Sequence, residues 1–233
     1  MPKTMQKINT ICFVPARMGS KSIKFKNIKK VKNKELIKYT FEFCNLFKTK
    51  FITVVSTDSK KIIKISKKYK IYNNGLRPKK LSGDKILTFD VIKYELKLIE
   101  KQTKKRFENI LVLQPTCPFR KETTLKKALN LIKKKRFDSI TTISDVGANH
   151  PERMKIIKND LLLNYNNKKK ENLKPRQSLK KVYIRSGSIY LIKRDAFFKN
   201  KSLVGNKCKG LVVVGKEQIN IDNSFDLKLA NIV

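Results

Sequence analysis

Short apolar runs rich in β-branched residues alternate along this chain with longer segments in which apolar residues recur every three or four positions. The first pattern predicts buried strands and the second predicts amphipathic helices. The expected strands are Thr10–Val14, Phe51–Ser56, Asn109–Leu113 and Ser139–Ile143. The expected helices are Glu35–Phe47, Ser59–Lys68, Thr88–Lys104 (with Thr88 as its N-cap) and Glu122–Lys135. This alternation predicts βαβ units and an α/β fold, in which a mainly parallel sheet carries helices on both faces.

The pattern changes after about Gly147, where a polar, loop-rich stretch runs to residue 181. Strand-like runs and a last helix follow, at Val182–Tyr183, Ser188–Ile192, Leu211–Val214 and Asp226–Ile232. We interpret residues 1–233 as one domain, with an inserted arm in a subregion at about residues 147–200. Such an arm can meet a second copy of the chain, so we expect a homodimer.

Four polar clusters fall where the expected strands or their following loops end. They are Arg17–Asn27, Arg77–Asp84, Gln114–Arg120 and Asn220–Asp226. Open parallel sheets bind their ligands outside the carboxyl ends of the strands. The four clusters are therefore expected to form one active site.

The first of these clusters has the composition of a phosphate-binding loop. Residues 14–21, with the sequence VPARMGSK, follow a buried strand, and Lys26 and Asn27 come shortly after. Glycine permits close approach of the backbone, free N–H groups point at oxygen, and cations offset the phosphate charge. The glycine spacing fits neither a Walker loop nor a GxGxxG loop. A solvated basic loop after a strand would have the same composition.

Three further segments carry candidate ligand contacts. Gln114 ends a strand in a turn made rigid by two prolines, and its amide can hydrogen-bond a sugar or a base. Arg176 could hold a carboxylate in a bidentate fork, or be an ordinary surface arginine. Asn220 and Asp222 lie two residues apart in an expected short strand, so their oxygens share one face and suit Mg²⁺. Asp222 could instead cap the final helix.

Composition limits the classes of protein that remain. The net charge of +38 favours a polyanion partner, but only 9 of the 56 basic residues are arginine and the lysines are spread over nearly every segment. Compositional drift explains that distribution better than a nucleic-acid surface does, because such surfaces concentrate arginine and aromatic residues. The four cysteines lie far apart, which argues against a zinc site and for reduced thiols. With no apolar run of membrane-spanning length and no signal-peptide pattern, we expect a cytoplasmic protein without a membrane partner.

Several short motifs follow one another in a recognisable order over most of the chain. They are Ala16-Arg17-x-Gly19-Ser20-Lys21 with Lys26-Asn27, Ser56-Thr57-Asp58, Leu76-Arg77-Pro78 with Asp84, the Gln114–Arg120 turn, Pro175-Arg176-Gln177, Gly187-x-Ile189-Tyr190 and Ile221-Asp222. In this the chain resembles the acylneuraminate cytidylyltransferases, the CMP-sialic acid synthetase family. The resemblance implies a Rossmann-like nucleotide-diphospho-sugar transferase fold, with residues 147–200 or so as a sugar-binding and dimerisation subregion. It also implies a nucleotidyltransferase that joins CTP and a nonulosonic (sialic-type) acid into a CMP-sugar and pyrophosphate for surface glycans, with Mg²⁺.

The resemblance also assigns roles to residues. The implied nucleotide-binding residues are Ala16, Arg17, Ser20, Lys21, Lys26, Asn27, Arg77, Ser82 and Asp84. The implied sugar-binding residues are Gln114, Arg176, Ser186 and Tyr190, with Arg176 on the carboxylate. The implied catalytic residues are Arg17, Lys21 and Asp222, and the implied Mg²⁺ ligands are Asp222 and Asn220. Stabilising charge on the transferring phosphate is the main demand of such a reaction.

The chain departs from the family pattern in ways that leave alternatives open. Asn220 replaces the first aspartate of an Ile-Asp-Ile-Asp stretch, Ser186 replaces an asparagine, and Ser22 with Lys24 replaces a glycine and a proline. The acceptor could therefore be a legionaminic or pseudaminic acid, or 3-deoxy-octulosonic acid. The non-enzymatic alternative is a basic polyanion-binding protein on the same fold. The one histidine, His150, is either a general base or a structural residue.

Overall fold

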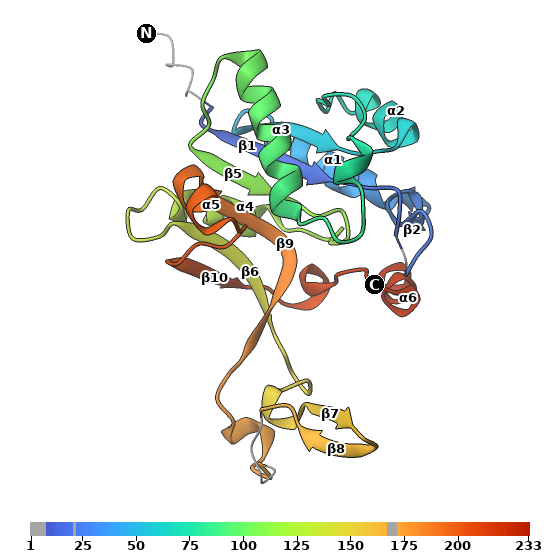
Figure 1. Ribbon diagram of the computed structural model, residues 1–233, viewed down its shortest axis with the longest axis vertical. Coiled ribbons are helices and arrows are strands. Elements are labelled where there is room, and N and C mark those ends of the chain that lie inside the picture. Colours follow the sequence, from blue (N-terminus) through green and yellow to red (C-terminus); the bar gives the residue numbers. More distant parts are fainter. Residues whose placement is uncertain (1–7, 21, 167–171) are drawn as a thin grey trace.

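The computed structural model describes residues 8–20, 22–166 and 172–233. Within these residues, six strands form one mixed sheet in the order β10-β6-β9-β5-β1-β4 (Figure 1). Their bounds are Thr10–Pro15 (β1), Phe51–Ser56 (β4), Asn109–Val112 (β5), Ser139–Asp145 (β6), Tyr183–Lys193 (β9) and Cys208–Val212 (β10). The four strands expected before residue 150 are confirmed, with ends that differ by two residues at most.

The second half of the sheet differs from the prediction in one respect. The run Ser188–Ile192 lies in strand β9, which begins at Tyr183, the second residue of the run Val182–Tyr183, and runs antiparallel to both β5 and β6. The chain returns from the arm in the direction opposite to β6, so β9 enters the sheet reversed. The expected run Leu211–Val214 overlaps β10, which begins three residues earlier and ends at Val212.

The expected helices are present, some of them shorter than predicted. The α-helices are Leu36–Asn45 (α1), Lys60–Lys68 (α2), Thr88–Thr103 (α3), Glu122–Leu131 (α4), Arg194–Asn200 (α5) and Ser224–Ile232 (α6). Short 3-10 turns lie at Lys26–Ile28, Lys79–Leu81, Pro151–Arg153, Arg176–Ser178 and Gly215–Gln218. Ser59 caps α2 through its hydroxyl oxygen, 3.3 Å from the Ile62 nitrogen. The cap predicted at Thr88 is wrong, because α3 begins after Leu87 without a side-chain cap and Thr88 is its first residue.

Helices cover both faces of the sheet, as the pattern predicts (Figure 1). On one face, α1, α2 and α4 pack against the sheet through residues such as Phe41, Ile62 and Leu125. On the other face, α3 and α5 contribute residues such as Ile92 and Phe197. Burying both faces explains why the central strands are nearly continuous apolar runs.

A third, smaller core joins the last helix to the segment after β1. Ile23, Val31 (in β2, Lys30–Val31, paired with β3, Lys34–Glu35) and Leu36 pack with Ile221 and Ala230. This cluster places residues 219–222 next to the loop that follows β1, although the two segments are about 200 positions apart in the sequence.

The arm lies away from the sheet, at the end of long extensions of β6 and β9 (Figure 1). It contains a hairpin of β7 (Lys155–Lys158) and β8 (Leu161–Asn164). Ile157, Leu161 and Leu162 on this hairpin are 76%, 65% and 67% exposed. Isolated exposed apolar residues are ordinary, but several on one small hairpin indicate a contact surface. None of the helices in the described part of the chain combines the length and apolar character needed to cross a membrane.

Candidate active site

A cleft of about 430 Å³ opens at the carboxyl ends of β1 and β5. All four predicted polar clusters contribute to its lining: Arg17, Gly19, Ser20, Lys26 and Asn27 from the first; Arg77, Gly83 and Asp84 from the second; Gln114 and Thr116 from the third; and Asn220 and Asp222 from the fourth. The four clusters therefore lie around one cleft, which is the arrangement that a single active site built from them requires. Ala16 is fully buried beneath the loop, and Lys21 lies outside the described residues.

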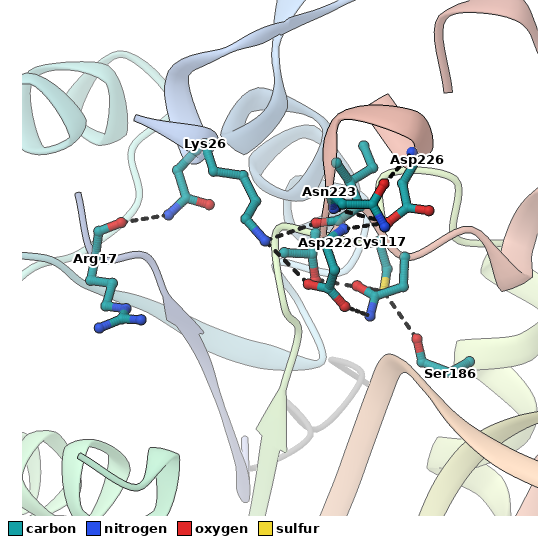
Figure 2. Close-up of polar contacts among 11 residues, drawn as sticks. Arg17, Lys26, Cys117, Ser186, Asp222, Asn223 and Asp226 are labelled. Atoms are coloured by element: carbon teal, nitrogen blue, oxygen red, sulfur yellow. Dashed lines mark hydrogen bonds and ion pairs between the residues drawn. The ribbon is translucent and has the colours of Figure 1, made fainter. Parts of the chain in front are cut away.

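The loop after β1 is held in shape by hydrogen bonds to its backbone. The Ala16 nitrogen donates to the Ser56 carbonyl at 2.9 Å, and the Met18 nitrogen donates to the Asp58 carboxylate at 2.7 Å. The Asn27 amide donates to the Arg17 carbonyl at 2.8 Å, so Asn27 supports the loop from inside (Figure 2). A loop fixed in this way presents its remaining polar groups to the cleft without having to be ordered by a ligand.

Two cations of this region face carboxylates across the cleft. The Arg17 guanidinium lies 2.6 Å from Asp84. The Lys26 ammonium lies 3.1 Å from Asp222 and 3.0 Å from the Ile221 carbonyl (Figure 2). The Lys26 side chain is only 12% exposed, whereas that of Asp222 is 62% exposed. Asp84 and Asp222 are the acidic residues among the described lining, so each is matched with a cation. An anionic ligand would compete with both carboxylates for these cations.

Arg77 is a buried cation tied to the end of β4. Its guanidinium donates to the Ser56 hydroxyl at 2.9 Å and to the Ser56 carbonyl at 2.6 Å, and burial lowers its pKa. The Ser56 hydroxyl in turn donates to Glu95 of α3 at 2.5 Å, and Asn74 donates to the other oxygen of Glu95 at 2.7 Å. Arg77 therefore borders the cleft while its Nε and Nη2 atoms bind at the buried end of β4. Ser82 donates to the Pro78 carbonyl and is not part of the described lining.

Glu95 should be the main source of stability in this network. Glu95→Ala should lower the free energy of unfolding by about 3 kcal/mol, because it leaves the buried Ser56 hydroxyl and the Asn74 amide without their acceptor. Urea unfolding followed by circular dichroism measures this. The matched control is Asp195→Ala, which breaks an exposed pair with Arg106 and should change nothing measurable. Equal stability of the Glu95 variant and the wild type would contradict the account.

Asn220 and Asp222 lie together at the other side of the cleft, although no strand forms there. The Asn220 amide nitrogen donates to Asp222 at 2.6 Å, and the Cys117 sulfur lies 3.6 Å from the Asn220 carbonyl oxygen (Figure 2). The helix cap is Asn223, in a reciprocal capping box with Asp226. The alternative in which Asp222 caps α6 is therefore wrong, and its carboxylate remains available to the cleft.

The chemistry of this pair fits a weakly held Mg²⁺ ion. Asp222 offers one exposed carboxylate, and Mg²⁺ is commonly bound by one or two carboxylates together with substrate phosphates. No group of three or more His, Cys, Asp or Glu residues that could hold a metal occurs in the described ranges. The residues therefore suit an ion that arrives with a phosphate ligand rather than a permanent metal.

The sugar-side residues expected from the sequence do not all reach the cleft. Gln114 lines it. Tyr190 is only 7% exposed and packs in the core under α3, because alternation along β9 turns its ring to that face. Ser186 is buried, and its hydroxyl donates to Thr142 at 2.8 Å. The predicted direct sugar contacts of Tyr190 and Ser186 thus have no support in this geometry.

Arg176 and His150 both lie in the arm, at a second, smaller cavity of about 230 Å³. His150 donates through Nε2 to the Lys180 carbonyl at 2.9 Å and accepts at Nδ1 from the Glu152 nitrogen at 3.1 Å. With both ring nitrogens engaged, His150 acts as a structural residue of the arm. Arg176 is placed away from the cleft of its own chain.

Three buried polar residues near the cleft are absent from the sequence-based list of site residues: Glu95, Cys117 and Arg120. Glu95 was detectable, since it lies on the apolar face of its helix, three positions after Ile92. Burial raises the pKa of the Cys117 thiol to about 11, so this thiol is protonated at neutral pH and is not a nucleophile. All four cysteines are free thiols.

The family model for cytidylyltransferases matches residues 11–204 of this chain. The chain belongs to the cytidylyltransferase family, and it is a nucleotidyltransferase. It is 30% identical to a CMP-N,N'-diacetyllegionaminic acid synthase of Legionella pneumophila, over 94% of this chain and 93% of that one. It is 28% identical to the protein of the same name in Campylobacter jejuni, over 94% and 92%. It is also 25% identical to an N-acylneuraminate cytidylyltransferase of Escherichia coli, of which it covers 51%.

Solved structures agree on the fold. A CMP:2-keto-3-deoxy-manno-octonic acid synthetase complexed with CTP superposes with a TM-score of 0.66, at 13% sequence identity, over 96% of this chain and 97% of that one. A 4-diphosphocytidyl-2C-methyl-D-erythritol synthase from Anaerococcus prevotii gives 0.62 at 17% identity, over 96% of each chain. The Rossmann-like α/β fold predicted from the sequence is confirmed.

Proposed function

We propose that this enzyme joins CTP to a nonulosonic acid, releasing pyrophosphate and a CMP-sugar for surface-glycan synthesis. The anomeric hydroxyl oxygen of the acid forms a bond to the α-phosphorus of CTP. The bond from that phosphorus to the β-phosphate oxygen breaks, pyrophosphate leaves, and the hydroxyl proton passes to solvent. The proposal is supported by the convergence of the four polar clusters on one cleft, with Lys26 and Asp222 in contact there.

The loop after β1 would hold the triphosphate. Arg17 and Lys26 exchange their carboxylate partners for phosphate oxygens, and Ser20 and Lys21 add contacts at the same loop. Asp222, released by Lys26, would hold Mg²⁺, whose chemistry there is to neutralise charge on the reacting phosphates. Asn220 is turned with its amide nitrogen toward Asp222, so its role as a second ligand requires the amide to rotate. Positioned cations supply most of the stabilisation that phosphoryl transfer needs.

The sugar side of the cleft would be completed by a second copy of the chain. Arg176, the expected partner of the sugar carboxylate, lies in an arm that carries exposed apolar residues and lies away from its own cleft. A homodimer in which each arm enters the other subunit's cleft accounts for both facts. A cytoplasmic location fits the four free thiols, and we propose neither a membrane nor a specific nucleic-acid partner.

Pyrophosphate release is the direct test of this function. The assay pairs each nucleoside triphosphate and Mg²⁺ with N-acetylneuraminic, diacetyllegionaminic, pseudaminic and 3-deoxy-octulosonic acids. Among the nucleoside triphosphates, we expect only CTP to support release, and we expect it to do so with one of the first three acids. The legionaminic acid is the second candidate acceptor, since the two relatives of that name align over more than nine-tenths of their length. The proposal would be overturned if UTP but not CTP supported release, or if none of the acids supported release. Tight polyanion binding that collapses with added salt would then favour the non-catalytic alternative.

A further inference from the structure

The turn that carries Gln114 is fastened to the rest of the molecule by Arg120. This residue is 8% exposed, and its guanidinium donates in three directions. Nε donates to the Ser188 carbonyl of β9 at 2.8 Å, Nη1 donates to the Thr40 hydroxyl of α1 at 3.1 Å, and Nη2 donates to the Gln114 carbonyl. One side chain thus joins the turn, the neighbouring strand β9 and helix α1.

On β9 the same turn meets the point where the strand leaves the sheet for the arm. Gly187 has a φ of +79°, and a Cβ built there would lie 2.8 Å from the Gln114 amide oxygen. The Cys117 sulfur donates to the Ser186 carbonyl at 3.3 Å. Cys117 and Arg120, both on the turn, therefore take the two carbonyls that flank Gly187. The Gln114 side chain lies in the gap between them.

All three acceptors of Arg120 are neutral oxygen atoms. The nearby carboxylate of Glu217 is engaged by the Lys121 nitrogen and the Thr124 hydroxyl instead. A buried guanidinium without a carboxylate partner is poor for stability. Its planar array of five donors, however, is well suited to hold several oxygens in fixed relative positions. Lysine, with donors on a single nitrogen, cannot reach three acceptors that lie in different directions.

We propose that Arg120 is a positioning residue for acceptor binding: by holding the carbonyls of Gln114 and Ser188, it fixes the Gln114 side chain toward the acid. The inference rests on the proposed function and deepens it. Arg120 does not line the cleft, so it acts through Gln114. Because the triphosphate contacts come from the loop after β1, a loss of Arg120 should leave CTP binding nearly intact.

The test is a double-mutant cycle of Arg120→Lys and Gln114→Ala, read as kcat/KM for the acid and KM for CTP. Arg120→Lys should lower kcat/KM for the acid about tenfold in the wild-type background, but less than about twofold when Gln114 is already alanine. KM for CTP should stay within about twofold. The matched control is Arg194→Lys, since Arg194 is also largely buried, is paired with Glu100, and lies outside the cleft. It should leave both kinetic constants unchanged.

A second readout does not depend on turnover. The side-chain amide signals of Gln114, assigned as those lost in Gln114→Ala, should shift in the NMR spectrum of Arg120→Lys and not in that of Arg194→Lys. If Arg120→Lys does not fold, Thr40→Val removes one acceptor of Arg120 and should move the same signals by less. Additive effects in the cycle with unmoved amide signals would overturn the inference. The amide signals could shift in Arg120→Lys while the wild type releases no pyrophosphate with any acid. That result would overturn the proposed function but not the hold of Arg120 on Gln114.

Discussion

Asp222→Ala should lower kcat for pyrophosphate release from CTP by about a thousandfold, with the fold unchanged. Asp222 pairs with Lys26 at the cleft and does not cap α6, so its loss would remove the carboxylate proposed to hold Mg²⁺ without removing the helix cap. The loss also removes the partner of Lys26, which is then free to bind phosphate. KM for CTP should therefore not rise, and the damage should fall on kcat. Steady-state kinetics over a range of CTP and Mg²⁺ concentrations separates the two constants.

The control for this prediction is Asn223→Ala. Asn223 caps α6 through its side chain, and its loss should lower stability by about 1 kcal/mol while leaving the rate within a few fold. If the two variants lost activity equally, Asp222 would act only by holding α6 in place. Mn²⁺ binding in the presence of CTP, followed by electron paramagnetic resonance, gives an independent measure. Asp222→Ala should abolish the bound signal and Asn223→Ala should keep it.

Chain pattern was sufficient to predict the layers and the location of the site. The alternation of strands and helices predicts a parallel sheet, and the carboxyl ends of parallel strands meet at one edge, so the sequence predicts that Arg17, Gln114 and Asp222 lie close together. The apolar patterns that predict strands and helices are reliable where both faces of the sheet are buried, because burial requires apolar residues at those positions. The prediction of Thr88 as an N-cap is wrong, because the preceding Leu87 takes the cap position and the helix starts without a side-chain cap.

The features of the site that the sequence does not predict depend on long-range packing. Tyr190 follows a motif of the family, but the alternation of side chains along β9 turns its ring into the core. The contact between Lys26 and Asp222 joins positions 196 apart, through a small core that no local pattern predicts. Arg120 ends a polar cluster in the sequence, and its burial depends on contacts with β9 and α1. Each of these facts concerns which segments meet rather than what each segment forms.

Arg176→Ala should lower kcat/KM for the acid by about a hundredfold, because a bidentate partner of the sugar carboxylate is lost. If each arm serves the other subunit, this variant can be rescued by a partner that is itself inactive. In a hybrid dimer of Arg176→Ala and Asp222→Ala chains, one cleft carries both lesions and the other carries neither. The hybrid should therefore work at about half of the wild-type rate per dimer, although each parent is nearly inactive.

The hybrid is made by co-expressing the two variants with different affinity tags and purifying in two steps, so that only mixed dimers remain. Sedimentation of the wild type first establishes that a dimer exists at assay concentrations. Arms that served their own clefts would give one lesion in each site and no recovery. A wild-type monomer would contradict the dimer, and full activity of the Arg176→Ala variant would contradict the role of Arg176 in binding the acid. Recovery to about half would instead place Arg176 in the partner's cleft, which is the arrangement that lets an arm so far from its own site contribute to catalysis.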